Sequence, residues 1–315
     1  MNPAIRAVCK AAFRQNMRVF GFYNGFQGII DEDFIELDSR SLSGILEQGG
    51  TMLQSSRCKA FYEEEGRRQA VRILRENRID ALVVIGGDGS LKGAHELHKL
   101  GVRIAGIPGT IDNDIAGTEI GVGVDTAANT IVQMVDRIKD TARSHRRCFL
   151  VEVMGRGSGY LALMTAVSTG AEVAVIPEFA PNYERIRKIL SYRYRDAFDN
   201  SIILLAEGVC SADEFEKRLL GDGAHPVDQE MRKTVLGHVQ RGGSPTFQDR
   251  LLASRMGEFV VLALVSGESG VMAGMKKSRL TLVPFEEVVG RHNPIPSDLI
   301  RLARHLGIEI GDPRE

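Results

Sequence analysis

Short apolar runs alternate with helix-like segments along almost the whole chain. The runs 81–85, 104–107 and 148–153 have the length and the aliphatic content that are typical of buried strands. Segment 126–142 carries a helical pattern, and Asp125 is expected to be its N-cap. Alternation of this kind produces a parallel sheet with helices on both faces. The sequence therefore predicts an α/β fold.

Length and charge set the broad class of protein. A chain of 315 residues suggests two domains. Lys and Arg number 40 against 41 for Asp and Glu, so neither bulk nucleic-acid binding nor membrane binding is indicated. The four cysteines form no C-x-x-C pair, which argues against a zinc site and against a disulfide framework. With no signal-like start and no apolar run of membrane-spanning length, we expect a cytoplasmic protein.

Loops rich in glycine and aspartate follow two of the expected strands, GGDGS at 86–90 and PGTIDND at 108–114. Either loop alone would fit an exposed turn, but two of them one strand–helix–strand unit apart indicate a ligand site at one sheet edge. Glycines let backbone N–H groups approach phosphate oxygens. Asp88 is suited to Mg²⁺, and Asp112 could take a proton from an attacking hydroxyl. The two loops therefore predict phosphoryl transfer.

Basic residues gather near strand ends in the second half of the chain. The planar guanidinium of arginine suits bidentate phosphate recognition. Each of these residues alone would be interpreted as a solvated side chain, but several stand beside glycines, which indicates a phosphate site. The group consists of Arg146, Arg147, Arg156, Arg232, His238 and Arg241.

At this level of detail the chain resembles the bacterial ATP-dependent 6-phosphofructokinases, the phosphofructokinase A family. The resemblance extends over essentially the whole chain, and four segments carry it: 86–90, 108–114, 152–156 and 236–245. It implies two doubly wound, Rossmann-like domains with mainly parallel sheets and an active site in the cleft between them. The implied ATP-binding domain is 1–123 plus 240–290, and the implied sugar-phosphate-binding domain is 124–239 plus 291–315. A homotetramer is also implied.

The reaction implied by the resemblance is the glycolytic transfer of a phosphoryl group from MgATP to the 1-hydroxyl of fructose 6-phosphate, giving fructose 1,6-bisphosphate and ADP. Asp112 would be the base, aided by Thr110, Asp114 and Arg156, and Asp88 the Mg²⁺ ligand. The implied ATP contacts are Arg57, Cys58, Gly87, Asp88, Gly89, Ser90 and Gly93. The implied sugar-phosphate contacts are Thr110, Asp112, Arg147, Met154, Gly155, Arg156, Glu207, Arg232, His238 and Arg241, with Arg147 and Arg232 reaching a neighbouring subunit's substrate.

The phosphoryl donor and the effectors are also addressed by the resemblance. Pyrophosphate-using relatives carry Asp and Lys where this chain has Gly89 and Gly109, so ATP is favoured and a pyrophosphate-dependent enzyme is the alternative. The residues matching an ADP or phosphoenolpyruvate site are Arg6, Lys10, Lys139 and Glu172. Because segment 196–200 carries two aspartates where regulated relatives carry lysines, we expect a weak effector response.

The amino terminus departs from the family. Family members begin with a strand and a Gly-Gly-Asp-x-x-Gly turn ahead of the position of Met1, so a gap is expected in the first sheet. A start upstream of Met1 is the favoured explanation, and a catalytically impaired binding or regulatory subunit is the alternative. Two other classes fit less well. A kinase of the NAD-kinase or diacylglycerol-kinase type would share only the first loop, and a dinucleotide-binding oxidoreductase would need a better match than Gly155, Gly157 and Gly159.

Overall fold

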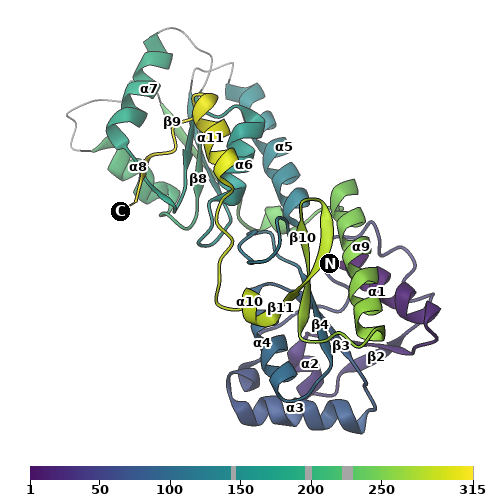
Figure 1. Ribbon diagram of the computed structural model, residues 1–315. Helices are drawn as coiled ribbons and strands as arrows, with labels where there is room; N and C mark the ends of the chain where they lie inside the picture. The colour runs from purple at the N-terminus through teal and green to yellow at the C-terminus, as the bar shows by residue number, and fades with distance from the viewer. Residues whose placement is uncertain (143–146, 196–200, 222–229, 315) are drawn as a thin grey trace. The chain divides into compact units, whose positions relative to one another are not determined.

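The computed structural model describes residues 1–142, 147–195, 201–221 and 230–314 (Figure 1). The chain divides into two compact units and passes between them several times. The first unit is Met1–Thr110, Asp114–Asp125 and Gly243–Asn293; the second is Ile111–Asn113, Thr126–Gly242 and Pro294–Glu315. Residues 111–113 thus group with the second unit, whereas the expected division had kept the chain in one domain as far as residue 123.

A four-stranded sheet forms the centre of the first unit, in the order β11-β10-β4-β3. Strand β4 is parallel to β3 and to β10, and β11 is antiparallel to β10. A separate antiparallel pair joins β1 to β2. The elements of this unit are α1 (Asn2–Arg14), β1 (Val19–Phe22), α2 (Phe26–Ile30), β2 (Phe34–Leu37), η1 (Lys59–Tyr62), α3 (Glu64–Glu76), β3 (Leu82–Gly86), α4 (Asp88–Lys99), β4 (Ile104–Pro108), α9 (Phe247–Val265), β10 (Val271–Lys276), β11 (Arg279–Pro284) and α10 (Phe285–Val288).

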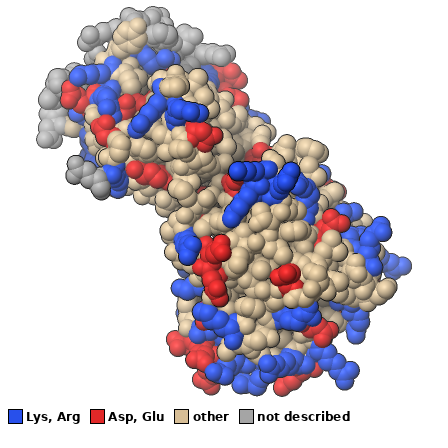
Figure 2. Space-filling view, viewed as in Figure 1, with Lys and Arg blue, Asp and Glu red and all other residues tan. Residues whose placement is uncertain are grey.

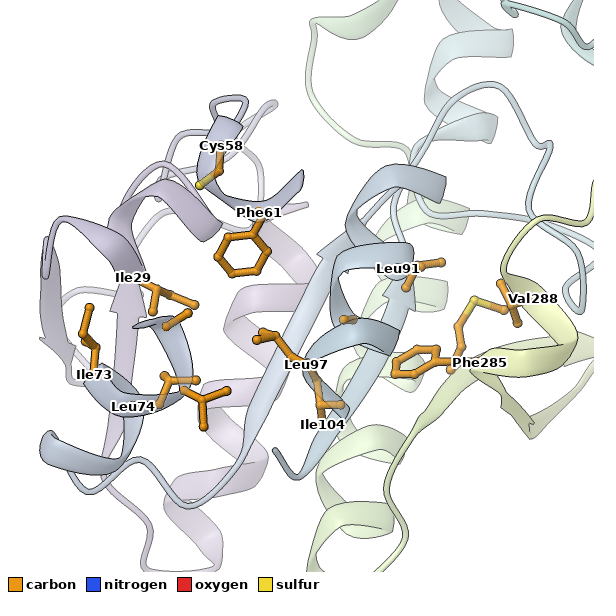
Figure 3. Packing of buried hydrophobic residues seen from close by; sticks show 14 of the residues in the cluster. Ile29, Cys58, Phe61, Ile73, Leu74, Leu91, Leu97, Ile104, Phe285 and Val288 are labelled. Carbon is orange, nitrogen blue, oxygen red and sulfur yellow. The ribbon is translucent and has the colours of Figure 1, made fainter. Parts of the chain in front are cut away.

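Helices cover both faces of this sheet. Successive side chains of a strand point to opposite faces, so each face of a buried strand presents apolar residues to a helix layer. Ile104 of β4 packs with α3, α4 and α10, and Figure 3 shows it beside Leu97 of α4. Ala105 and Ile107 of the same strand pack instead with α1 and α9. All five residues of β4 are buried, as expected of a central parallel strand. Strand β3 pairs only with β4 among the described strands, and Leu82–Ile85 are half-buried.

The second unit has a parallel sheet in the order β6-β8-β5-β9. Helices α7 and α8 cover one face, where Leu150, Ile203 and Phe215 are buried together, while α6 packs on β8 and α11 on α6. Its elements are α5 (Val124–Ala142), β5 (Cys148–Val153), α6 (Tyr160–Thr169), β6 (Val173–Val175), β7 (Phe179–Ala180), α7 (Tyr183–Arg195), β8 (Ser201–Ala206), α8 (Ala212–Leu220), β9 (Met231–Val235), η2 (Gly237–Arg241), α11 (Ser297–His305) and β12 (Asp312–Pro313). The predicted α/β class with mainly parallel sheets is confirmed.

One local prediction is wrong. Asp125 is not the N-cap of α5, because the helix begins at Val124 and Asp125 lies in its first turn. The Asp125 carboxylate instead accepts a hydrogen bond from the Thr246 hydroxyl at 2.5 Å. Thr246 is itself the N-cap of α9, where its side chain accepts from the backbone N–H of Asp249. The Asp125 carboxylate therefore bonds to a residue distant in the sequence and does not cap its own helix.

Charged side chains of both signs are intermixed over the visible face of both units (Figure 2). Within the described ranges, no helix is both long enough and apolar enough to cross a membrane.

Candidate active site

The glycine loop of the first unit closes the end of β3 and opens α4. Gly87 is the residue before the helix, and Asp88 is the first helical residue. The backbone N–H groups of Ser90 and Leu91 point to the Gly87 carbonyl at 2.9 and 3.0 Å, which winds the first turn. A helix N-terminus of this kind presents N–H groups and a positive dipole end, and both favour phosphate.

The glycines of this loop differ in what surrounds them. A Cβ on Gly89 would meet nothing within 4 Å, so this backbone borders open space that a phosphate could occupy. A Cβ on Gly109 would lie 3.3 Å from the Gly86 nitrogen, and the Gly109 N–H donates to the Gly86 carbonyl at 2.9 Å. The two predicted loops are therefore joined directly. Gly93 differs again, because its Cβ would lie 2.5 Å from the Phe26 ring, so this glycine serves helix packing.

Residues Arg57 and Cys58 precede the short helix η1. Cys58 is buried in the core cluster with Phe61 (Figure 3). The Phe61 ring stacks on the Phe26 ring, with 4.3 Å between the ring centroids. Arg57 is exposed. Of this predicted pair, only the arginine side chain faces solvent.

Asp88 suits a magnesium ion bound together with substrate phosphates. Mg²⁺ is commonly held by one or two carboxylates, with phosphates and waters completing its shell. Among the described residues no group of three or more His, Cys, Asp or Glu side chains could hold a metal without such help. A single carboxylate at a phosphate-binding helix end fits this cation.

The second predicted loop, 108–114, places Asp112 in the second unit. Asp112 is 4% exposed, and its Oδ2 lies 4.0 Å from Nε of Arg156. The Arg156 side chain is itself largely exposed. Asn113 and Arg156 have positive φ angles of 52° and 51°. This conformation is tolerated by asparagine but is uncommon for arginine, so the contacts around the turn hold the Arg156 backbone in it.

Glu207 holds the turn that carries Arg156. It follows β8, and its Oε1 accepts hydrogen bonds from the backbone N–H groups of Gly155 (3.2 Å) and Arg156 (3.0 Å). Strands β5 and β8 are parallel neighbours, so their carboxyl ends bring 154–156 and Glu207 together. Gly208 completes the contact, because a Cβ there would lie 1.8 Å from the Arg156 carbonyl oxygen.

Gln240 links this turn to the segment with His238 and Arg241. It is 1% exposed; its Oε1 accepts from the Met154 N–H at 3.1 Å, and its Nε2 donates to the Gly237 carbonyl at 2.9 Å. His238 and Arg241, both exposed, lie on the same short helix η2. The sequence reasoning missed Gln240 and Gly208, although Gln240 stands inside the recognised 236–245 segment.

Arg147 and Arg232 meet through a residue that the sequence reasoning also missed. Arg147 Nε donates to Glu230 Oε2 at 2.7 Å, and Arg232 forms an ion pair with the other oxygen of Glu230. The parallel pairing of β5 with β9 brings these side chains together. Arg146 lies outside the described residues.

The four residues suggested for effector binding are divided between the units. Arg6 and Lys10 lie on α1, and Lys10 donates to the Ser39 hydroxyl at 3.2 Å. Lys139 and Glu172 belong to the second unit. The Glu172 carboxylate accepts from the Ile202 N–H at 2.6 Å and pairs with Arg193 at 2.8 Å, and burial raises its pKa. Segment 196–200 lies outside the described residues.

Comparisons with known proteins agree with this geometry. The family model for phosphofructokinase matches residues 1–264. A protein of Thermotoga neapolitana called ATP-dependent 6-phosphofructokinase is 45% identical over 308 residues, which cover 97% of this chain and 95% of the relative. ATP-dependent 6-phosphofructokinase 2 of Bacteroides thetaiotaomicron is 42% identical over 98% of this chain and 94% of its own.

Solved structures give the same result for the fold. The T-state phosphofructokinase of Pichia pastoris superposes with a TM-score of 0.85 at 32% identity, covering 97% of this chain and 35% of that longer chain. A pyrophosphate-dependent phosphofructokinase of Marinobacter aquaeolei, 19% identical, superposes with a TM-score of 0.81 over 100% of this chain and 90% of its own, and shows the shared fold alone.

Proposed function

The chain belongs to the phosphofructokinase family, and from this we propose that it transfers the terminal phosphoryl group of ATP to the 1-hydroxyl of fructose 6-phosphate. The observation that carries the proposal is the buried Asp112 carboxylate beside the Arg156 guanidinium. Glu207 holds the turn on which Arg156 lies. ATP-dependent relatives at 42–46% identity over nearly the full chain favour this reaction over a non-catalytic role.

Each group has a defined task in the transfer. Asp112 accepts the proton of the sugar 1-hydroxyl while the oxygen of that hydroxyl bonds to the γ-phosphorus. The bond from this phosphorus to the ADP oxygen breaks in the same step. Arg156 offsets negative charge beside Asp112. The N–H groups at the start of α4 bind the ATP phosphates, and Asp88 would hold Mg²⁺. When bound, Mg²⁺ neutralises charge on the phosphate oxygens.

The sugar 6-phosphate is assigned to the arginines and the histidine of the second unit. His238 and Arg241 serve the chain's own substrate, while Arg147 and Arg232 reach the substrate of a neighbour in a homotetramer. Support comes from their position: Arg232 lies on β9, which among the described strands pairs only with β5 at the edge of its sheet. A cytoplasmic location follows from the same proposal, since all four cysteines are unpaired and buried.

Two glycines indicate whether the phosphoryl donor is ATP or pyrophosphate. Gly89 leaves open space beside the first turn of α4, and Gly109 packs closely against Gly86, where a Cβ would lie 3.3 Å from the backbone nitrogen. Both features suit a nucleotide donor. Incubating the protein with fructose 6-phosphate, Mg²⁺ and either donor, and following products by ³¹P NMR, tests this directly. Fructose 1,6-bisphosphate should form with ATP, and formation with pyrophosphate alone would refute the proposal.

A further inference from the structure

The outer face of α9 exposes two pairs of large apolar side chains. The inner face of the helix is accounted for, because Leu252, Met256 and Val260 are buried against α1 and the sheet. On the outer face Phe247 is 71% exposed, Leu251 44%, Leu262 45% and Val265 46%. A helix at a permanently solvated surface normally presents polar residues there. Large apolar side chains that gather on one exposed helix face instead indicate an interaction surface.

The charged residues of this face stand at its centre. Arg255 and Glu258 are exposed, one turn apart, between the two apolar pairs. Arg255 donates to the Ser278 carbonyl at 3.4 Å, and among the described residues no ion pair joins it to Glu258. Each charge therefore remains available to a partner of opposite sign.

The order of residues along the face is symmetric about the Met256–Gly257 peptide. Arg255 and Glu258 are equidistant from this point, Leu251 and Leu262 are equidistant further out, and Phe247 and Val265 stand at the ends. If two such helices lie antiparallel about a twofold axis at this peptide, each Arg255 faces a Glu258, and each Leu251 faces a Leu262. A parallel pair would set Arg255 against Arg255. A face that complements itself in this way is what a twofold contact between identical chains requires.

We propose that α9 of one chain docks antiparallel on α9 of a second copy, through Phe247, Leu251, Arg255, Glu258, Leu262 and Val265. This surface belongs to the first unit and is separate from Arg147 and Arg232, so the contact adds to the assembly proposed for the reaction. The face is about 27 Å long at 1.5 Å per residue. A contact made by one helix face is small, so the association is expected to depend on protein concentration.

The first experiment is sedimentation velocity of the full chain over a range of protein concentrations. The wild-type protein should reach twice the mass of Leu262→Glu, because docking of two substituted chains would bury two unpaired carboxylates, one from each chain, against Leu251 of the other. Leu306→Glu, at a 59% exposed leucine of the second unit, is the matched control and should behave as the wild type. Equal masses for the wild type and Leu262→Glu at every concentration overturn the proposal.

Charge exchange tests the antiparallel arrangement. Arg255→Glu and Glu258→Arg should each weaken association about tenfold, since two attractive contacts become repulsive. A mixture of these two variants should recover the wild-type association, because each acidic helix then meets a basic one. No recovery in the mixture overturns the antiparallel docking. Turnover at low protein concentration should be unchanged in all of these variants, since none of the residues belongs to the reaction site.

Discussion

Single residues set the charge balance of the proposed sugar-phosphate site, and Glu230 is the clearest case. Arg147 and Arg232 are both bound to its carboxylate, so any phosphate they bind must compete with it. Competition of this kind between exposed groups costs a fraction of a kcal/mol to about 1 kcal/mol for each pair.

We therefore expect Glu230→Gln to lower the KM for fructose 6-phosphate about two- to fivefold, with kcat unchanged. Steady-state kinetics with varied sugar phosphate measure this. Glu216→Gln is the matched control: Glu216 pairs with Lys233 at 2.6 Å in the same unit, and its loss should leave the KM as it is. A raised KM for Glu230→Gln would show that the carboxylate positions the arginines instead of competing for them.

At the scale of secondary structure, the carboxyl ends of the parallel neighbours β5 and β8 carry the proposed contacts to the sugar phosphate. The Arg156 backbone lies between the Glu207 carboxylate and Gly208, with no room for a side chain at position 208. Backbone shifts of about 1 Å at a reacting group can cost up to 10²-fold in rate.

Gly208→Ala should therefore reduce kcat/KM by about tenfold or more, because its Cβ displaces Arg156. Gly157→Ala is the matched control in the neighbouring turn, since a Cβ there meets nothing within 4 Å. Both variants should keep the wild-type circular dichroism spectrum. Equal activity of the two would mean that the position of the Arg156 backbone does not limit the reaction.

How well the sequence predicted an element depended on whether its signal was local. Strand β5 has the predicted bounds, 148–153, because a mainly apolar run defines it. The β1–β2 pair and the β10–β11 hairpin were not predicted, because these strands are defined by hydrogen bonds to a partner strand and not by a local sequence pattern. The same limit applies to the site. Its loops were visible in the sequence. The hydrogen bonds of Gln240 to Met154 and of Glu230 to Arg147 were not, because they join residues that are 86 and 83 positions apart.

For the whole molecule, the central expectation is that active sites draw residues from two chains. Asp112 and Arg232 belong to the same unit, yet the proposal assigns Asp112 to the chain's own substrate and Arg232 to a neighbour's. Chains lacking one or the other should therefore complement each other.

Mixing Arg232→Ala with Asp112→Ser under conditions that exchange subunits should restore part of the activity, because some sites combine an intact base with an intact arginine. Each variant assembled alone is the control and should stay at its own low activity. Hybrids no more active than the average of the two parents would place both residues at the same site.

The most direct measurement of the proposed reaction is the kcat of Asp112→Ser with ATP and fructose 6-phosphate, taken together with the Kd for the sugar phosphate. Loss of a general base costs roughly 10²–10⁴-fold in rate. We expect kcat to fall by that factor while the Kd changes little, and the exposed Asp298→Ser on α11 to match the wild type in both. An Asp112→Ser enzyme that turns over at the wild-type rate would contradict the assignment of Asp112 as the base.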